Sequence, residues 1–304
     1  MEQRELPTGL ETNPQRPNVV VATATLYKNW YLGQVNSIRD TDKVRGDVAI
    51  DSLGRTIRNG FSVVDIDGGS SPAFLEALND VGVEVTTQKE RGYSEGRREG
   101  MTLAQEDSPK AIFTVEPEKP SLMDSIDKLT KPIVEGDADI VFPARDRSAF
   151  DTYPKAQADF EQRANKIANK ILREREILKD DTPDLDWWMG ARMIRNDPEV
   201  LALFQEKYDF REFGNKLDET INLEAWPNTL YLPVIFALAR GMKVASVPID
   251  YVHPESLTLN ETGDPAFDRK RETQYKGIIV AMIEGVRRVE QDNGVGKKQT
   301  RLIS

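Results

Sequence analysis

Cysteine is absent from this chain of 304 residues, and histidine occurs once, at His253. The lack of cysteine excludes disulfide bonds, thiolate metal sites and cysteine nucleophiles, and it is compatible with an intracellular protein. Any chemistry that needs an imidazole must use His253. It follows a short apolar run, Val244-Ala-Ser-Val-Pro-Ile-Asp-Tyr-Val-His, that reads as a strand. A lone histidine just past a strand is either a hydrogen-bonded loop residue or a ligand.

Long apolar runs and an excess of positive charge are missing too. No stretch approaches the ~18–20 apolar residues that span a bilayer, and the N-terminal segment lacks the apolar core of a signal peptide. We therefore expect no transmembrane segment and a cytoplasmic location. The chain has 41 Lys and Arg against 51 Asp and Glu, a formal net charge of −10. This argues against nucleic acid as a partner, although a local basic pocket for a diphosphate is still compatible.

Short β-rich segments alternate with helical patterns in the first half of the chain. The expected strands are residues 18–25, 61–67, 83–87, 111–115 and 138–143. Helical spacing of apolar residues marks 72–81, 94–104 and a helix that starts near Ser121. This alternation predicts an α/β fold with a mostly parallel, doubly wound sheet and helices on both faces.

The second half has longer helical patterns. Helices are expected around 160–172, 197–206, 230–241 and 274–289, with a strand at 242–251. No linker rich in Pro, Gly or Ser separates the halves, so we expect residues 18–147 and 148–290 to be two halves of one domain that share a sheet. The terminal segments 1–17 and 291–304 are expected to be mobile because of their polar composition.

Several polar residues follow the predicted strands, and ligands of open parallel sheets bind at that edge. These residues are Thr25, Tyr27, Asp65, Asp67, Arg97, Glu116, Glu118 and Arg145. Carboxylates and arginines gathered at one edge suit metal-assisted handling of a nucleotide diphosphate.

Glu116-Pro-Glu118 is the strongest candidate for a metal site in this group. Side chains at i and i+2 of an extended segment leave the same face, and Pro117 biases Glu116 toward that conformation. With His253, the two glutamates would suit Mn²⁺ or Mg²⁺. The alternative is a solvated charged turn that ends at Lys119.

Other candidates also have two interpretations. Arg97 could meet a diphosphate at a helix N-terminus or lie on a charged helix face. Asp65 could accept from a base or cap a turn. Trp187 and Trp188, with Gly190, could form a platform for a sugar or be buried core residues. A Walker A motif, a G-x-G-x-x-G after the first strand and a G-x-S-x-G elbow are all lacking.

In order along the chain, these segments resemble the GT-A glycosyltransferases, especially the family 2-like enzymes and the mannosylglycerate and glucosyl-3-phosphoglycerate synthases. The resemblance runs from about residue 18 to about 256. Gly92-Tyr-Ser-Glu-Gly-Arg-Arg-Glu-Gly is similar to the family's G-x-x-x-A-R-N-x-G segment and places Arg97 on its arginine. The resemblance implies that Thr25 and Tyr27 line a nucleobase pocket and that Asp65 or Asp67 reads the base.

The same resemblance implies roles for the remaining candidates. Glu116-Pro-Glu118 stands where the family has a D-x-D metal motif, and His253 matches a late metal-binding histidine of several members. Asp184-Leu-Asp-Trp-Trp-Met-Gly is similar to the acceptor-side loop, so Asp186, or Asp184, would be the base if the reaction inverts configuration. The remaining expected substrate contacts are Lys119, Arg145, Trp188 and Gly190.

The expected function is therefore a hexosyltransferase-type activity that depends on a divalent cation. The enzyme would move a sugar from a nucleoside-diphosphate sugar to a small acceptor, with the cation on Glu118 and His253 and with Arg97 supporting the leaving diphosphate. A homodimer is compatible with these features. A sugar-phosphate nucleotidylyltransferase and a non-catalytic nucleotide-sugar-binding module are the two alternatives.

Overall fold

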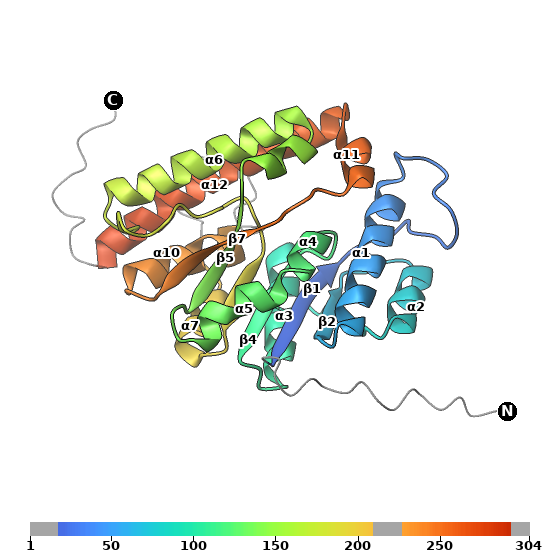
Figure 1. The fold of residues 1–304 in the computed structure, drawn as a ribbon, viewed down its shortest axis with the longest axis horizontal. Helices are drawn as coiled ribbons and strands as arrows, with labels where there is room; N and C mark the ends of the chain where they lie inside the picture. Colours follow the sequence, from blue (N-terminus) through green and yellow to red (C-terminus); the bar gives the residue numbers. More distant parts are fainter. Residues whose placement is uncertain (1–17, 209–226, 293–304) are drawn as a thin grey trace.

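The computed structural model describes residues 18–208 and 227–292, and these form one seven-stranded sheet with helices around it (Figure 1). The strand order is β3-β2-β1-β4-β6-β5-β7. The strands are β1 Val19–Thr25, β2 Ser62–Asp67, β3 Glu84–Thr87, β4 Ala111–Thr114, β5 Ile140–Arg145, β6 Arg192–Arg195 and β7 Val244–Ile249. Every pairing is parallel except those of β6, which runs antiparallel to β4 and β5. The predicted mostly parallel sheet is confirmed, and strands from both halves of the chain belong to it.

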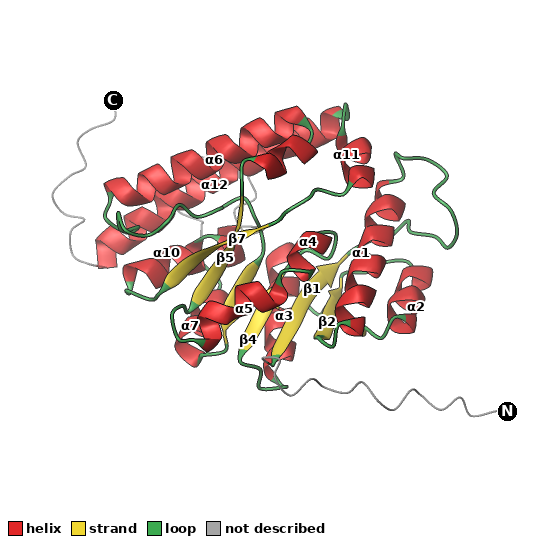
Figure 2. Ribbon diagram, viewed as in Figure 1, coloured by secondary structure: helices red, strands yellow, loops and turns green. Residues whose placement is uncertain are grey.

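Helices cover both faces of the sheet, as Figure 2 shows. They are α1 Thr41–Arg58, α2 Pro72–Asp80, α3 Tyr93–Gln105, α4 Pro120–Met123, α5 Ile126–Val134, α6 Lys155–Glu174, α7 Pro198–Gln205, α9 Pro227–Leu230, α10 Leu232–Ala239, α11 Glu255–Glu261 and α12 Pro265–Asp292, with a 3-10 turn η1 at Ser148–Thr152. The helix expected from Ser121 is split into α4 and α5. Strand β6 and helix α11 were not predicted, because both are short and β6 begins and ends with arginine.

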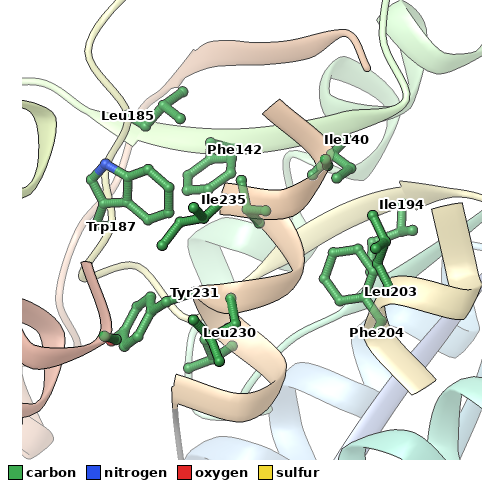
Figure 3. Close-up of a cluster of buried hydrophobic side chains, with 14 of the residues drawn as sticks. Ile140, Phe142, Leu185, Trp187, Ile194, Leu203, Phe204, Leu230, Tyr231 and Ile235 are labelled. Carbon is green, nitrogen blue, oxygen red and sulfur yellow. The ribbon is translucent and has the colours of Figure 1, made fainter. Parts of the chain in front are cut away.

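The two faces of the sheet bury two separate apolar cores. Val19 and Val21 of β1 point to one face, against α1, α2 and α5, while Val20 and Ala22 point to the other. In the second core Trp187 lies edge-on to Phe142 of β5, with ring centroids 5.2 Å apart. Figure 3 shows these two rings beside Ile235 of α10. Trp187 is therefore a core residue, which is the second of the two interpretations that the sequence allowed for it.

Helices α6 and α12 lie side by side along the top of the molecule in Figure 1. The helix predicted at 274–289 is longer at both ends. Its first turns are strongly charged, with Arg269, Lys270, Arg271 and Glu272 in sequence, so they lack the apolar spacing that marks a helix. These extra turns bring Lys270 and Arg271 to the candidate site described below.

Helix α11 is fastened to the segment that leads into α1. The Arg39 guanidinium donates to the carbonyls of Asn260, at 2.6 Å, and Thr262, at 3.0 Å. The Asn260 amide donates in turn to the carbonyl of Ile38 at 2.6 Å. These bonds hold residues more than 200 positions apart in sequence side by side (Figure 1).

Among the described helices, none is both long enough and apolar enough to pass through a bilayer. The segments 1–17 and 293–304, which composition predicts to be mobile, lie outside the described residues, while Gln291 and Asp292 belong to α12.

Candidate functional site

A pocket of about 220 Å³ lies at the carboxyl edge of the sheet. Its wall is assembled from segments far apart in the sequence, which include the loop after β4, the end of β5, the loop before β6, the segment after β7 and helices α1, α11 and α12. The polar lining residues are Arg45, Tyr93, Glu116, Glu118, Lys119, Arg145, Tyr153, Gln157, Glu161, Trp188, His253, Glu261, Lys270, Arg271 and Gln274. Small-molecule sites usually have about 300–1,000 Å³, so this pocket has room for a sugar or diphosphate group rather than a whole nucleotide sugar.

Glu118 is the first of the three predicted metal ligands in this wall. Its side chain is 8% exposed, and Arg45 contacts its Oε1 through both Nε and Nη2 at 3.0 Å. Burial raises the pKa of Glu118, but Arg45 and a hydrogen bond from the Tyr27 hydroxyl outweigh it, so the pKa falls below its usual value. Glu118 is therefore a buried carboxylate that stays ionised.

His253 faces the same pocket as a neutral imidazole. Its side chain is 7% exposed and stacks on Tyr153, with ring centroids 4.3 Å apart. Burial, with a further contribution from Arg271, lowers the pKa of His253 to about 3. Neither ring nitrogen has a hydrogen-bond partner in residues 18–208 and 227–292. A buried neutral imidazole with unused nitrogens is the form of histidine that binds metal ions.

Glu116 is held differently from Glu118, although only one residue separates them. Lys119 Nζ lies 3.0 Å from its Oε2, and the Tyr93 hydroxyl donates to its Oε1 at 3.3 Å. Burial raises the pKa of Glu116, but Lys119 and Arg97 together lower it to about 2. The carboxylate also lies directly over Gly190, where a Cβ atom would be 2.3 Å from Oε1. Because glycine has no Cβ atom, Gly190 leaves room for the Glu116 carboxylate.

The three predicted metal ligands thus share a pocket but not a coordination sphere. Within the part of the chain that the structure describes, no three His, Cys, Asp or Glu side chains converge closely enough to hold a metal ion. Glu118 is occupied by Arg45 and Glu116 by Lys119. The donor chemistry nevertheless fits Mn²⁺ or Mg²⁺, because buried ionised carboxylates lie near an imidazole with unused nitrogens. The shared ion of the sequence analysis stays a prediction.

Arg97 lies behind the pocket rather than in its wall. Its Nη2 donates to Thr114 Oγ1 at 2.8 Å and to the carbonyl of Gly190 at 3.0 Å, and its Nη1 donates to the Tyr93 hydroxyl at 3.3 Å. Arg97 braces the loop that carries Gly190. The expected direct contact with a diphosphate is not part of this arrangement.

Asp186 also lies outside this pocket, in a cluster centred on Arg145. The Arg145 guanidinium grips both carboxylate oxygens, with Nε–Oδ2 at 2.7 Å and Nη2–Oδ1 at 2.8 Å, and Asn165 donates to Oδ1 at 2.7 Å. Burial raises the pKa of Asp186, but Arg145 outweighs it and the pKa is lowered. A carboxylate held in this way is a poor proton acceptor. The other candidate base, Asp184, is exposed and pairs with Arg173 at 2.7 Å.

The residues expected to hold the nucleobase already have hydrogen-bond partners within the protein. Asp65 is fully buried and accepts hydrogen bonds from Thr23 at 2.7 Å and Thr25 at 2.6 Å. Burial raises its pKa to about 6. Asp67 accepts from the backbone N–H groups of Gly69 and Ser70, which is the turn-capping role. These residues lie beside the pocket, and of this group only the Tyr27 hydroxyl reaches one of its lining residues, Glu118.

Sequence reasoning missed five charged residues of the wall, which are Arg45, Glu161, Glu261, Lys270 and Arg271. None of them follows a strand, so the rule that strand ends carry the site could not find them. The one usable signal was proximity in sequence, because Glu261 follows soon after His253 in the chain. Lys119, Arg145 and Trp188 do line the pocket, as the sequence predicted.

No protein-family model and no curated protein matches this sequence. Solved structures do match. A structure of glucosyl-3-phosphoglycerate synthase from Mycobacterium tuberculosis superposes with a TM-score of 0.54 at 11% identity, covering 89% of this chain and 81% of that one. The same enzyme in complex with Mn²⁺, UDP-glucose and phosphoglyceric acid gives 0.51 at 12% identity, with 89% and 80% covered. At this identity the shared property is the fold, so the GT-A fold is confirmed.

Proposed function

We propose that this protein is a metal-dependent glycosyltransferase that moves a sugar from a nucleoside-diphosphate sugar to a small acceptor. One observation carries the proposal. His253, a neutral imidazole with two unpartnered nitrogens among the described residues, faces the same pocket as the ionised Glu118 at the carboxyl edge of a GT-A sheet. Carboxylate and imidazole at that place are what a divalent cation needs in order to meet a diphosphate.

The solved structures add support of a more general kind. A protein with the same fold has been solved in complex with Mn²⁺, UDP-glucose and phosphoglyceric acid. That protein therefore accommodates a cation, a nucleotide sugar and an anionic acceptor together. In this chain the pocket wall contains Lys270 and Arg271, which favour an acceptor that carries negative charge.

The residues of the pocket divide the proposed work among them. Glu118 and His253 would hold the cation, which when bound would stabilise negative charge on the leaving diphosphate. The half-buried Trp188 offers a ring face to the transferred sugar. Lys270, whose pKa is lowered to about 8 by burial, lines the pocket and would attract an anionic acceptor there. Arg97 positions the backbone of Gly190, and through it the carboxylate of Glu116.

The experiment is a donor screen with the purified chain. UDP, GDP and ADP sugars are each incubated with Mn²⁺ or with chelator, with and without phosphoglycerate as an anionic acceptor, and release of the nucleoside diphosphate is measured. We expect release from at least one donor with Mn²⁺ only, and its loss in His253→Ala. Formation of pyrophosphate from a nucleoside triphosphate and a sugar phosphate would favour a nucleotidylyltransferase instead. Binding of a donor with no turnover would favour a non-catalytic module. A cytoplasmic location and a homodimer stay part of the proposal.

A further inference from the structure

Arg192, the first residue of β6, is a positive charge buried without a carboxylate. It is 0% exposed, and its guanidinium lies over the ring of Phe142, 3.6 Å from the centroid. Burial lowers its pKa to about 9. In residues 18–208 and 227–292 its Nε and Nη2 have no hydrogen-bond partner, and its Nη1 bonds only to backbone carbonyls. A buried charge is costly and an apolar side chain would pack there at lower cost, so packing alone does not account for this arginine.

The acceptors of Arg192 belong to the loop that leads into β6. Its Nη1 donates to the carbonyl of Met189 and, at 2.6 Å, to the carbonyl of Ala191. The carbonyl between them, that of Gly190, accepts from Arg97 Nη2 at 3.0 Å. Three consecutive carbonyls are therefore bonded to two buried guanidinium groups, an arrangement that we call the carbonyl clamp.

The carbonyl clamp acts on a loop that is also held through its N–H groups. The Trp188 N–H donates to Asn165 Oδ1 at 2.9 Å, and the Met189 N–H donates to Asp186 Oδ1 at 3.3 Å. The carbonyls of the next residues are held by the clamp. The backbone that carries Trp188 into the pocket wall is thus bonded on both sides.

The parts that this loop places lie in the pocket. Trp188 and Met189 line it. Gly190 lies under the Glu116 carboxylate, whose Oε1 would be 2.3 Å from a Cβ atom there. A loop shift of about 1 Å would therefore displace the Trp188 ring and push against Glu116, and errors of that size in a site lower reaction rates strongly.

We propose that Arg192 is a positioning residue for sugar transfer, because it holds the loop that places Trp188 and Glu116 in the pocket. This role rests on the proposed function, although it depends only on the transfer of the sugar and on no metal ligand. Arg97 holds one carbonyl of the loop, whereas Arg192 holds the carbonyls on both sides of it. Arg192 is therefore the larger part of the clamp.

The shape of arginine suits this role. Its Nη1 carries two N–H groups in a fixed plane, so one nitrogen serves two carbonyls, and the flat guanidinium stacks on Phe142. Lysine in its place would keep the charge and the donors but lose the stacking. Methionine would fill a similar volume and supply no donor. The two substitutions therefore separate the bonds to the loop from the packing.

The first measurement is hydrogen exchange of the purified chain without ligand, followed by mass spectrometry. In Arg192→Met the amides of residues 186–191 should exchange at least about tenfold faster, because two bonds from a charged donor are lost. The amides of α7, which packs on the same core as Phe142, should keep their wild-type rates. Arg192→Lys should lie between Arg192→Met and the wild type.

The matched control is Arg195→Met at the other end of β6. Arg195 is 39% exposed and pairs with Asp139, away from the loop. This variant should exchange at residues 186–191 as the wild type does.

The second measurement is steady-state turnover of the donor found in the screen, with phosphoglycerate as the acceptor. A displaced acceptor-side loop should raise the KM of the acceptor in Arg192→Met and lower its kcat/KM about 10²-fold, while the KM of the donor stays within about twofold. Partial unfolding lowers the amount of active enzyme and raises neither KM, so this split separates positioning from stability. Arg192→Lys should recover part of the loss, and Arg195→Met should turn over as the wild type does.

Two results overturn the role of Arg192. One is unchanged exchange of residues 186–191 in Arg192→Met, and the other is faster exchange with kcat and both KM values equal to those of the wild type. If Arg192→Met does not fold, Arg192→Lys decides, and wild-type exchange and turnover in that variant reject the role. A wild type that releases no nucleoside diphosphate from any donor would reject the proposed function, and with it the role in transfer, whereas faster exchange in Arg192→Met would still establish the carbonyl clamp.

Discussion

Two arginine–carboxylate clusters lie at the same edge of the sheet and differ in how completely they are bonded. Arg145, 1% exposed, grips both oxygens of Asp186 and also pairs with Glu161 and the Tyr153 hydroxyl. Arg45 is partly exposed, divides its charge between Glu118 and Glu261, and lies near an imidazole with unused nitrogens. The residue types are the same. The charged groups of the first cluster are paired with one another, whereas the second includes two unpartnered imidazole nitrogens and a partly exposed arginine. We therefore expect the first cluster to support the site and the second to bind the ligand of the proposed function.

The largest effect is expected from a substitution in the cluster around Arg145, whose charged groups are all paired. Asp186→Ala leaves the buried Arg145 without its bidentate partner, and removal of one member of a buried ion pair costs about 3–5 kcal/mol. Urea unfolding should show a loss of free energy of this size. Asp184→Ala, at an exposed position two residues away, should stay within about 0.5 kcal/mol of the wild type. An Asp186→Ala protein as stable as the wild type, but inactive, would return Asp186 to the role of catalytic base.

The next largest effect is expected in the open cluster, which consists of Arg45, Glu118, Glu261 and His253. His253→Ala and Glu118→Ala should each lower Mn²⁺-dependent release of nucleoside diphosphate by about 10²–10³-fold, because each removes a group that is proposed to hold the cation against the diphosphate. Their unfolding free energies should fall by less than that of Asp186→Ala. Glu135→Ala, on the exposed end of α5, serves as the control and should keep full activity. Loss of activity that simply follows loss of stability in all variants would remove the distinction between the clusters.

The sequence predicted the sheet and much of the pocket for one physical reason. Apolar runs mark strands, and strands in parallel order carry their functional side chains at one edge, which brings Glu118, Lys119 and His253 together. Side-chain direction could not be predicted in the same way. Arg97 and Asp186 are near the edge, as expected, but Arg97 bonds the carbonyl of Gly190 and Asp186 bonds Arg145 at the end of β5.

The remaining wall residues depend on packing that no local pattern records. Arg45 and Glu261 are 216 positions apart and meet because α11 packs beside α1, where Arg39 bonds the end of α11. Strand β6 was missed because a strand of four residues with arginine at both ends carries no apolar run.

Asp65 lies outside both clusters and is a buried acid that accepts hydrogen bonds from hydroxyl groups instead of from arginine. Its pKa of about 6 lies above the unfolded value of 3.8, so the folded state binds the proton more tightly between these pH values. Stability from this group is therefore present below pH 4 and is lost as the pH rises through 6. Asp65→Asn lacks this loss. Its unfolding free energy relative to the wild type should rise by about 3 kcal/mol between pH 3.5 and pH 7. Parallel pH profiles of the two proteins would show that folding leaves the pKa of Asp65 unchanged.

The smallest effect concerns the support of Glu116. In Gly190→Ala the added methyl group would lie 2.3 Å from the Glu116 carboxylate and must push it away from Lys119. We expect about a tenfold loss of donor turnover with a stability change of about 1–3 kcal/mol. Gly277→Ala is the matched control, because no atom lies within 4 Å of its added Cβ. That variant should be as active as the wild type and up to about 1 kcal/mol more stable, since alanine favours a helix. Full activity in Gly190→Ala would show that the position of Glu116 is unimportant.

The central claim is that the open cluster around His253 binds a divalent cation. Calorimetric titration of Mn²⁺ into the chelator-treated protein, with UDP present, tests it most directly when the wild type and His253→Ala are compared. We expect one Mn²⁺ per chain in the wild type and at least about a tenfold weaker affinity in the variant. Equal binding by the two proteins, or no binding by either, would contradict it.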